Sequence, residues 1–173
     1  GGGTIAAADI DGITKMEKFT IVGTTSSTTL SIHDNNGTSA GTITLDGSAL
    51  TTGVFTVSAA AEQDATVTIK GGGAADIITA SASTAAGDTI TANAGADIII
   101  FATAGLTSAD TVAGGAGTDT LKMSNASTVV DADFTNVTGV ETFTASSDKA
   151  INLTLGALAM AAGITTVTFT EDE

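Results

Sequence analysis

The chain has 173 residues, enough to bury a sizeable core, and its formal net charge is −14. This acidity disfavours attraction to nucleic acid or to an anionic membrane, because both need basic patches. The absence of cysteine excludes disulfides and thiolate metal sites, and no apolar run is long enough to insert into and span a membrane. His33 is the only histidine, so the usual nucleophile–base pairs are hardly available and we expect no enzyme activity.

Short runs rich in β-branched residues recur along the chain at short and nearly even intervals, separated by Gly, Asn, Asp and Ser turn signals. The predicted strands are residues 19–22, 30–32, 42–45, 54–57, 67–69, 77–78, 89–90, 98–101, 111–112, 120–121, 140–144, 151–155 and 165–170. Even pacing of this kind fits a β-solenoid, in which the chain coils in laps, and it also fits a β-sandwich. The acidic residues favour the solenoid.

Aspartates in the middle of the chain form two alternating series. Asp76, Asp97 and Asp119 follow one another at intervals of 21 and 22 residues, and Asp88 and Asp110, which fall between them, are 22 apart. A lap of about 22 residues with two strands and two turns places each series in a column along one edge of a solenoid. A cation between carboxylates of consecutive laps would offset their mutual repulsion.

Residues 114–122 show what such a column would bind. They read GGAGTDTLK and match, position for position, the nonapeptide G-G-x-G-x-D-x-U-x, in which U is a large aliphatic residue. Glycines permit positive φ, so several carbonyl oxygens can converge on one point, and Asp119 adds a charged oxygen there. Converging hard oxygen donors in a flexible loop are what Ca²⁺ prefers. The copies that end at Asp76 and Asp97 are degenerate, with Ala74 and Ala92 in place of glycine.

On these motifs the chain resembles the RTX proteins, secreted bacterial polypeptides with Ca²⁺-bound parallel β-rolls. The resemblance implies an all-β fold, a right-handed parallel β-roll or β-solenoid with about 22 residues per turn, with Ca²⁺ as the cofactor. It also implies a location outside the cell or at the cell surface. The implied metal ligands are the carboxylates of Asp76, Asp88, Asp97, Asp110 and Asp119 and backbone carbonyls of the turns at Gly71, Gly73, Gly95, Gly114, Ala116 and Gly117.

A second repeat of longer period links the two ends of the chain. Residues 8–20 align with residues 132–144 at a constant offset of 124, which pairs Asp9 with Asp133 and Phe19 with Phe143. Residues 133–143 and 45–50 resemble segments of bacterial surface-layer and RTX surface proteins. We therefore expect a flank at 1–70 that continues the solenoid, an RTX-like roll at 71–122, and a C-terminal module at 123–173 that repeats the N-terminal unit. The repeat suggests either a longer chain of such modules or a unit that abuts copies of itself.

Other polar residues have less specific interpretations. Asp64 lies slightly more than one lap before Asp88 and could extend its column, although no glycine turn adjoins it. Turn or cap roles are predicted for Asp9, Glu17, Asp133 and Glu141. Thr-x-Thr triplets resemble the ice-binding faces of some β-helical antifreeze proteins, but their spacing along the chain is uneven.

These observations favour a structural function. We expect a Ca²⁺-dependent extracellular assembly protein, a subunit of a surface-layer lattice or a filament, whose partners are copies of itself and cell-surface polysaccharide. The alternative is a repeat or spacer module of an RTX adhesin. An ice-binding solenoid and the secretion domain of an RTX enzyme are less favoured.

Overall fold

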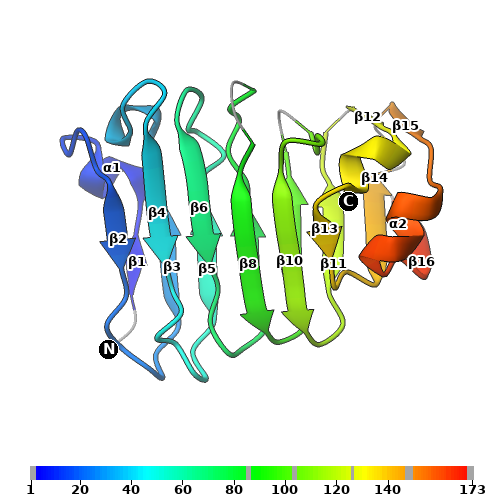
Figure 1. The fold of residues 1–173 in the computed structure, drawn as a ribbon. Coiled ribbons are helices and arrows are strands. Elements are labelled where there is room, and N and C mark those ends of the chain that lie inside the picture. Colours follow the sequence, from blue (N-terminus) through cyan, green and yellow to red (C-terminus); the bar gives the residue numbers. More distant parts are fainter. Residues whose placement is uncertain (1–2, 85–86, 103–104, 126, 147–149, 171–173) are drawn as a thin grey trace.

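In the computed structural model the chain coils into stacked laps whose strands form two facing parallel sheets (Figure 1). The structure describes residues 3–84, 87–102, 105–125, 127–146 and 150–170. Within them the first sheet has eight strands, in the order β1 (Thr4–Ile5), β3 (Thr28–Ser31), β5 (Phe55–Ser58), β7 (Ile77–Thr79), β9 (Ile98–Phe101), β11 (Thr120–Met123), β14 (Thr142–Ser146) and β16 (Thr166–Thr170).

The second sheet of the described residues has six strands, in the order β13 (Val137–Thr138), β10 (Thr111–Ala116), β8 (Thr89–Ala94), β6 (Thr66–Lys70), β4 (Thr42–Asp46) and β2 (Lys18–Thr20). A separate pair joins β12 (Ser127–Val129) to β15 (Ile151–Leu153). Because the chain alternates between the two large sheets, most strands pair with the strand two places along the sequence. The all-β parallel roll predicted from the sequence is confirmed, and the β-sandwich is not the fold.

The core is built from columns of aliphatic side chains stacked lap upon lap. In the six-stranded sheet Leu45, Ile69 and Ile90 are register partners, and each is fully buried. An equivalent column in the eight-stranded sheet contains Leu30, Val57, Ile78, Ile99, Leu121 and Phe143. Burying one such side chain contributes about 1.5–3 kcal/mol. The polar residues that alternate with them point outward, since successive side chains of a strand face opposite sides.

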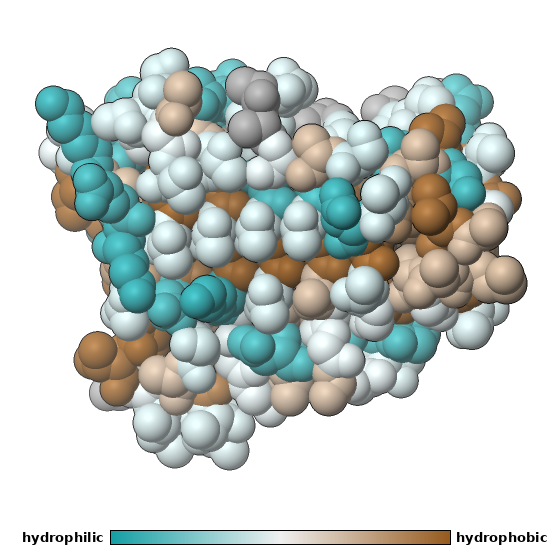
Figure 2. All heavy atoms as spheres, viewed as in Figure 1, coloured by the Kyte–Doolittle hydropathy of each residue, from teal (hydrophilic) through white to brown (hydrophobic). Residues whose placement is uncertain are grey.

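The outward face of the six-stranded sheet is polar and pale in Figure 2. Thr44, Thr68, Thr89 and Thr111 form one column across it, each the register partner of the next. These threonines stay in register although their intervals in the sequence differ, because the turns between the strands differ in length. Threonine is a good strand former on a solvated face, which accounts for this column.

In the part of the chain that the structure describes, three short helical turns and one longer helix lie outside the sheets: α1 (Ala7–Ile10), η1 (Asp34–Asn36), η2 (Asp131–Phe134) and α2 (Ala157–Ala162). The pattern of strands did not predict α2. The Asp131 carboxylate caps it by accepting hydrogen bonds from the backbone N–H groups of Gly156 (2.8 Å) and Ala159 (2.9 Å). The hydrogen bond from Ala159 is the main reason that the pKa of Asp131 is lowered. In the described residues, no helix is long and apolar enough to cross a membrane.

Both ends of the molecule use the same order of elements, as the offset of 124 suggests. Asp9 Oδ2 accepts the Ala6 N–H and Asp133 Oδ2 accepts the Val130 N–H, both at 2.9 Å, so both aspartates have the predicted cap role. The pairing of β1 with β3 corresponds to that of β12 with β15, and the pairing of β2 with β4 to that of β14 with β16. The two copies lie on different sheets, because β2 belongs to the six-stranded sheet and β14 to the eight-stranded one. The domain boundaries at 70 and 122 stay a prediction.

Candidate metal-binding edge

The two edges of the roll are built differently. At the glycine edge, the lower one in Figure 1, short turns at 71–76, 95–97 and 117–119 lead from the six-stranded to the eight-stranded sheet. At the loop edge, opposite it, longer segments such as 80–88 and 102–110 lead back. Residues 85–86 and 103–104 of these loops lie outside the described residues. The two predicted aspartate columns lie one on each edge.

On the glycine edge the carboxylates form a ladder from lap to lap. Asp97 Oδ1 accepts the backbone N–H of Asp76 at 2.7 Å, and Asp119 Oδ1 accepts that of Asp97 at 2.8 Å. Asp76 Oδ1 accepts the backbone N–H of Phe55 at 2.7 Å. All three aspartates are at most 1% exposed. The sequence therefore placed these three residues in the correct column.

The second carboxylate oxygen of this ladder has few protein partners. Asp76 Oδ2 accepts the Gly72 N–H. Within the described residues, Asp97 Oδ2 and Asp119 Oδ2 are buried and have no hydrogen-bond partner. A buried acceptor without a donor costs about 1–3 kcal/mol, and more when it is charged. These two oxygens are therefore suited to a metal ion.

Glycines bring carbonyl oxygens of neighbouring laps beside these carboxylates. A Cβ on Gly71 would lie 2.3 Å from Ala92 O and 2.6 Å from Asp76 Oδ2. One on Gly114 would lie 1.9 Å from Gly139 O and 2.6 Å from Asp119 Oδ2. Each missing Cβ leaves a position where a carbonyl and a carboxylate oxygen converge. Uncharged and charged hard oxygens together make a donor set that fits Ca²⁺.

The remaining glycines of the edge serve the turn itself. Gly95 and Gly117 have φ of +142° and +144°, a region that other residues rarely adopt. The Gly95 N–H donates to Ala116 O at 2.9 Å, and the Gly73 N–H donates to Leu50 O at 2.7 Å. These glycines therefore hold successive turns in close contact, with backbone packed on backbone.

On the loop edge, each oxygen of both carboxylates has protein donors. Asp88 Oδ1 accepts from Val67 N and Ser81 Oγ, both at 3.0 Å, and its Oδ2 accepts from Ser81 N at 2.7 Å. Asp110 Oδ1 accepts from Asp88 N at 2.8 Å, and its Oδ2 accepts from Thr107 N at 2.8 Å and Thr107 Oγ1 at 3.0 Å. This second column also exists as predicted, and a serine and a threonine donate hydrogen bonds to its carboxylate oxygens.

Asp64 does not extend the second column. The residue that precedes Asp88 in the ladder is Val67, whose N–H donates to Asp88 Oδ1. Asp64 lies earlier in the chain, in the turn before β6, and is exposed. Its interval from Asp88 in the sequence was misleading because it is longer than one lap of the ladder.

A family model described as the RTX calcium-binding nonapeptide repeat (4 copies) matches residues 83–102 and 104–122. The chain carries an RTX-type calcium-binding β-roll. The matched segments contain Asp88, Asp97, Asp110 and Asp119 and leave out Asp76. RTX repeats generally belong to secreted proteins, in which they form structural modules. No curated protein and no solved structure matches the chain.

The carboxylates of the RTX β-roll are held close together and away from water. Burial raises the pKa of Asp76, Asp88 and Asp119. The pKa of Asp97 is raised to about 6, first by burial and then by the charges of Asp119 and Asp76 on either side of it. At neutral pH a divalent cation would offset the loss of hydration that burial causes. It would also reduce the repulsion between the neighbouring carboxylates.

The column of the glycine edge has a fourth acidic member, for which the sequence predicts a turn or cap role. Glu141 Oε2 accepts the Asp119 N–H at 2.8 Å, so Glu141 continues the column of the glycine edge by one lap. The signal was present in the sequence, since Glu141 follows Asp119 by 22 residues. Its neighbourhood has no complete nonapeptide, so the spacing is the one sequence signal for this residue.

Proposed function

We propose that this protein is a secreted structural module of a bacterial surface layer or filament, whose RTX β-roll folds and assembles when Ca²⁺ binds. The observation that carries this proposal is the pair of buried, unpartnered carboxylate oxygens of Asp97 and Asp119 on the glycine edge. In a chain with a net charge of −14, a divalent cation stabilises the folded state most where acidic residues are stacked. Folding and metal binding are then one coupled process.

The ligands we assign lie on the glycine edge. The carboxylates of Asp97 and Asp119 would hold the ions, because each has a buried oxygen without a protein donor. Asp76, whose two oxygens accept from Phe55 and Gly72, and Glu141 lie at the two ends of the column. Carbonyl oxygens beside Gly71 and Gly114 would complete the coordination. Bound Ca²⁺ supplies positive charge between laps and so cross-links them. Asp88 and Asp110 would act as structural acceptors on the loop edge, because their oxygens already have donors.

The two columns can be separated by matched substitutions. Asp119→Asn removes a charge from an oxygen without a protein partner, and we expect the Ca²⁺ concentration at the folding midpoint to rise on the order of tenfold. Asp110→Asn removes a charge that backbone and hydroxyl donors satisfy, so stability should fall with little change in that midpoint. Circular dichroism during Ca²⁺ titration measures both. An equal shift of the midpoint in the two variants would contradict our assignment and place ions on both edges.

The support for self-assembly is the apolar surface at the C-terminal end of the roll. Val167 is the register partner of Phe143 and so continues the buried column of the eight-stranded sheet, yet it is 41% exposed, and Phe169 is 53% exposed. Apolar side chains gather at the end formed by α2 and β16 in Figure 2. The outer edge of β16 also presents strand groups that a further lap could pair with.

The opposite end offers a matching surface. An apolar groove there is lined by Ile5, Phe19, Ile21 and Val22, and the first lap leaves the edges of β1 and β2 open in the described residues. Because the two ends share one order of elements, a second copy could continue the laps of the first. Binding to cell-surface polysaccharide stays a prediction.

We expect the purified chain to form large assemblies in Ca²⁺, and the double variant Val167→Ser/Phe169→Ser to fold with Ca²⁺ but remain small. The reason is that both side chains would be buried only in the assembly. Size-exclusion chromatography with light scattering measures this. Thr166→Ser/Thr168→Ser is the matched control on the alternate side chains of β16 and should assemble normally. Wild-type protein that folds with Ca²⁺ and stays monomeric would support the second candidate, a spacer module of an RTX adhesin.

A further inference from the structure

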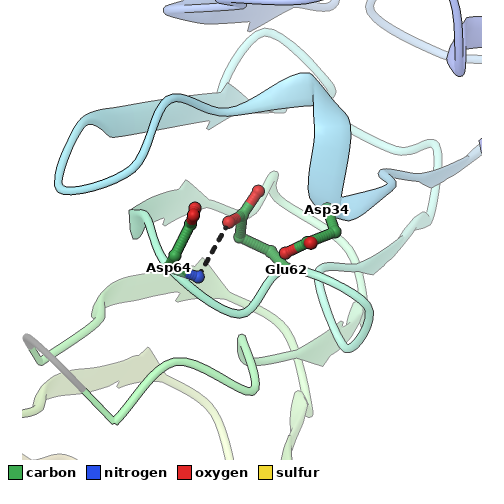
Figure 3. Close-up of side chains that lie close together, drawn as sticks. All are labelled: Asp34, Glu62 and Asp64. Atoms are coloured by element: carbon green, nitrogen blue, oxygen red, sulfur yellow. Dashed lines mark hydrogen bonds between the residues drawn. The ribbon is translucent and has the colours of Figure 1, made fainter.

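Three acidic residues from two neighbouring laps meet on the loop edge, outside the RTX repeats. Asp34 is the first residue of η1, in the turn between β3 and β4, and Glu62 and Asp64 lie in the turn between β5 and β6. One carboxylate oxygen of each lies within 4.8 Å of the others. Figure 3 shows the Glu62 carboxylate between Asp34 and Asp64. The cluster therefore joins two consecutive laps of the roll.

Glu62 is the buried member of this cluster, with an exposed fraction of 0%. Its Oε1 accepts the backbone N–H groups of Asp64 (3.2 Å) and Ala65 (2.9 Å). Its Oε2 is buried and has no hydrogen-bond partner in the described residues. A Cβ on Gly37 would lie 2.8 Å from Oε2 and 3.0 Å from side-chain atoms of Ala65 and Ile43, so this oxygen lies beside the turn that also carries Asp34. The unpartnered oxygen is an observation independent of the acidic residues beside it.

Among the described residues, no ion pair balances the charge of the cluster. The one ion pair in the described part of the chain joins Lys18 to Asp46, so no lysine there is paired with Asp34, Glu62 or Asp64. Asp34 Oδ1 accepts the Gln63 N–H at 2.9 Å, which fixes its carboxylate against the next lap. Burial raises the pKa of Glu62, and the charge of Asp34 adds to that effect. A cation beside the three carboxylates would offset their mutual repulsion.

We propose that Asp34, Glu62 and Asp64 bind one Ca²⁺ at a site separate from the glycine edge. Three carboxylates supply hard oxygen ligands, and the exposed position of Asp64 leaves room for waters to complete a coordination of about six to eight oxygens. The ion would cross-link the laps that contain η1 and β6. Ca²⁺ control would then extend into the N-terminal flank, which contains no complete nonapeptide.

The test counts Ca²⁺ bound per chain by equilibrium dialysis of the full-length protein at pH 7. Glu62→Gln keeps the shape of the side chain and removes its charge, and it should bind one ion fewer than wild type. Asp64→Asn, at an exposed position that leaves the core intact, should bind the same ion at least tenfold more weakly. Glu17→Gln is the control, since Glu17 is an exposed glutamate outside the cluster.

Hydrogen exchange separates this site from the glycine edge. In Ca²⁺, Glu62→Gln should lose protection in residues 34–65 while residues 89–122 remain protected, and Asp119→Asn should show the reverse. The proposal is overturned if both Glu62→Gln and Asp64→Asn bind as many ions as wild type with unchanged affinity. It is also overturned if Glu62→Gln stabilises the protein and leaves the ion count unchanged, which would identify Glu62 as a buried neutral acid.

Discussion

Without Ca²⁺, the protein is expected to be more stable at pH 5 than at pH 7. The folded-state pKa of Asp97 is raised from 3.8 to about 6, so between these values the folded chain binds more protons than the unfolded chain. Stability therefore falls as pH rises through this window, and Asp97 alone contributes about 1 kcal/mol of that fall between pH 5 and pH 7. Asp76, Asp88 and Asp119, whose pKa values are also raised, act in the same direction.

Saturating Ca²⁺ should reverse this pH dependence. The ion binds the deprotonated carboxylates, so protons compete with it and the loaded protein loses stability on acidification. Far-UV circular dichroism shows whether the Ca²⁺-free chain is folded at each pH value, and urea unfolding measures the free energy of unfolding under each condition in which the chain is folded. A Ca²⁺-free protein that is more stable at pH 7 would show that the carboxylates of the glycine edge are not crowded.

Gly117→Ala is expected to cost about 4 kcal/mol or more, enough to unfold most of the protein. Gly117 has φ of +144°, and a Cβ there would lie 1.6 Å from Gly95 O in the neighbouring lap. The contact is with backbone, which cannot move without separating the laps. Far-UV circular dichroism and urea unfolding in Ca²⁺ measure the effect.

The matched control is Gly12→Ala, where a Cβ would meet nothing within 4 Å and φ lies outside the positive region. We expect no loss of stability, and a gain of up to about 1 kcal/mol from the reduced freedom of the unfolded chain. Equal stability of the two variants would mean that the turns at 95–97 and 117–119 are not packed backbone to backbone.

The sequence predicted most of the fold because the pattern of a solenoid is local and repeats. The strands at 98–101 and 120–121 are recognisable from β-branched residues, and the interval between aspartates sets their register. The helix α2 was not recognisable in the same way. Its capping residue, Asp131, lies 25 residues before Gly156, so the interaction that fixes its start depends on the fold.

The chemistry of the edges could be predicted only in part. Aspartate spacing identified both columns, but it could not show that Ser81 and Thr107 satisfy one column while Asp97 Oδ2 and Asp119 Oδ2 remain without partners. The two columns differ in their hydrogen-bond donors because Ser81 and Thr107 lie in irregular loops that return to the aspartates of the loop edge. The cluster of Asp34 with Glu62 has no sequence signal, because its members lie in different turns and follow no shared motif.

The parallel ladders of the roll have a mechanical consequence. Their hydrogen bonds run along the long axis, so a pulling force on the two ends would load the laps one after another. A lap whose partners are 22 residues apart adds only about 5 Å to the folded length, but it extends to about 70 Å when it peels away. A roll pulled from its two ends would therefore lengthen in discrete steps, each of which dissipates mechanical work. An ion bound between two laps would raise the force needed to separate them.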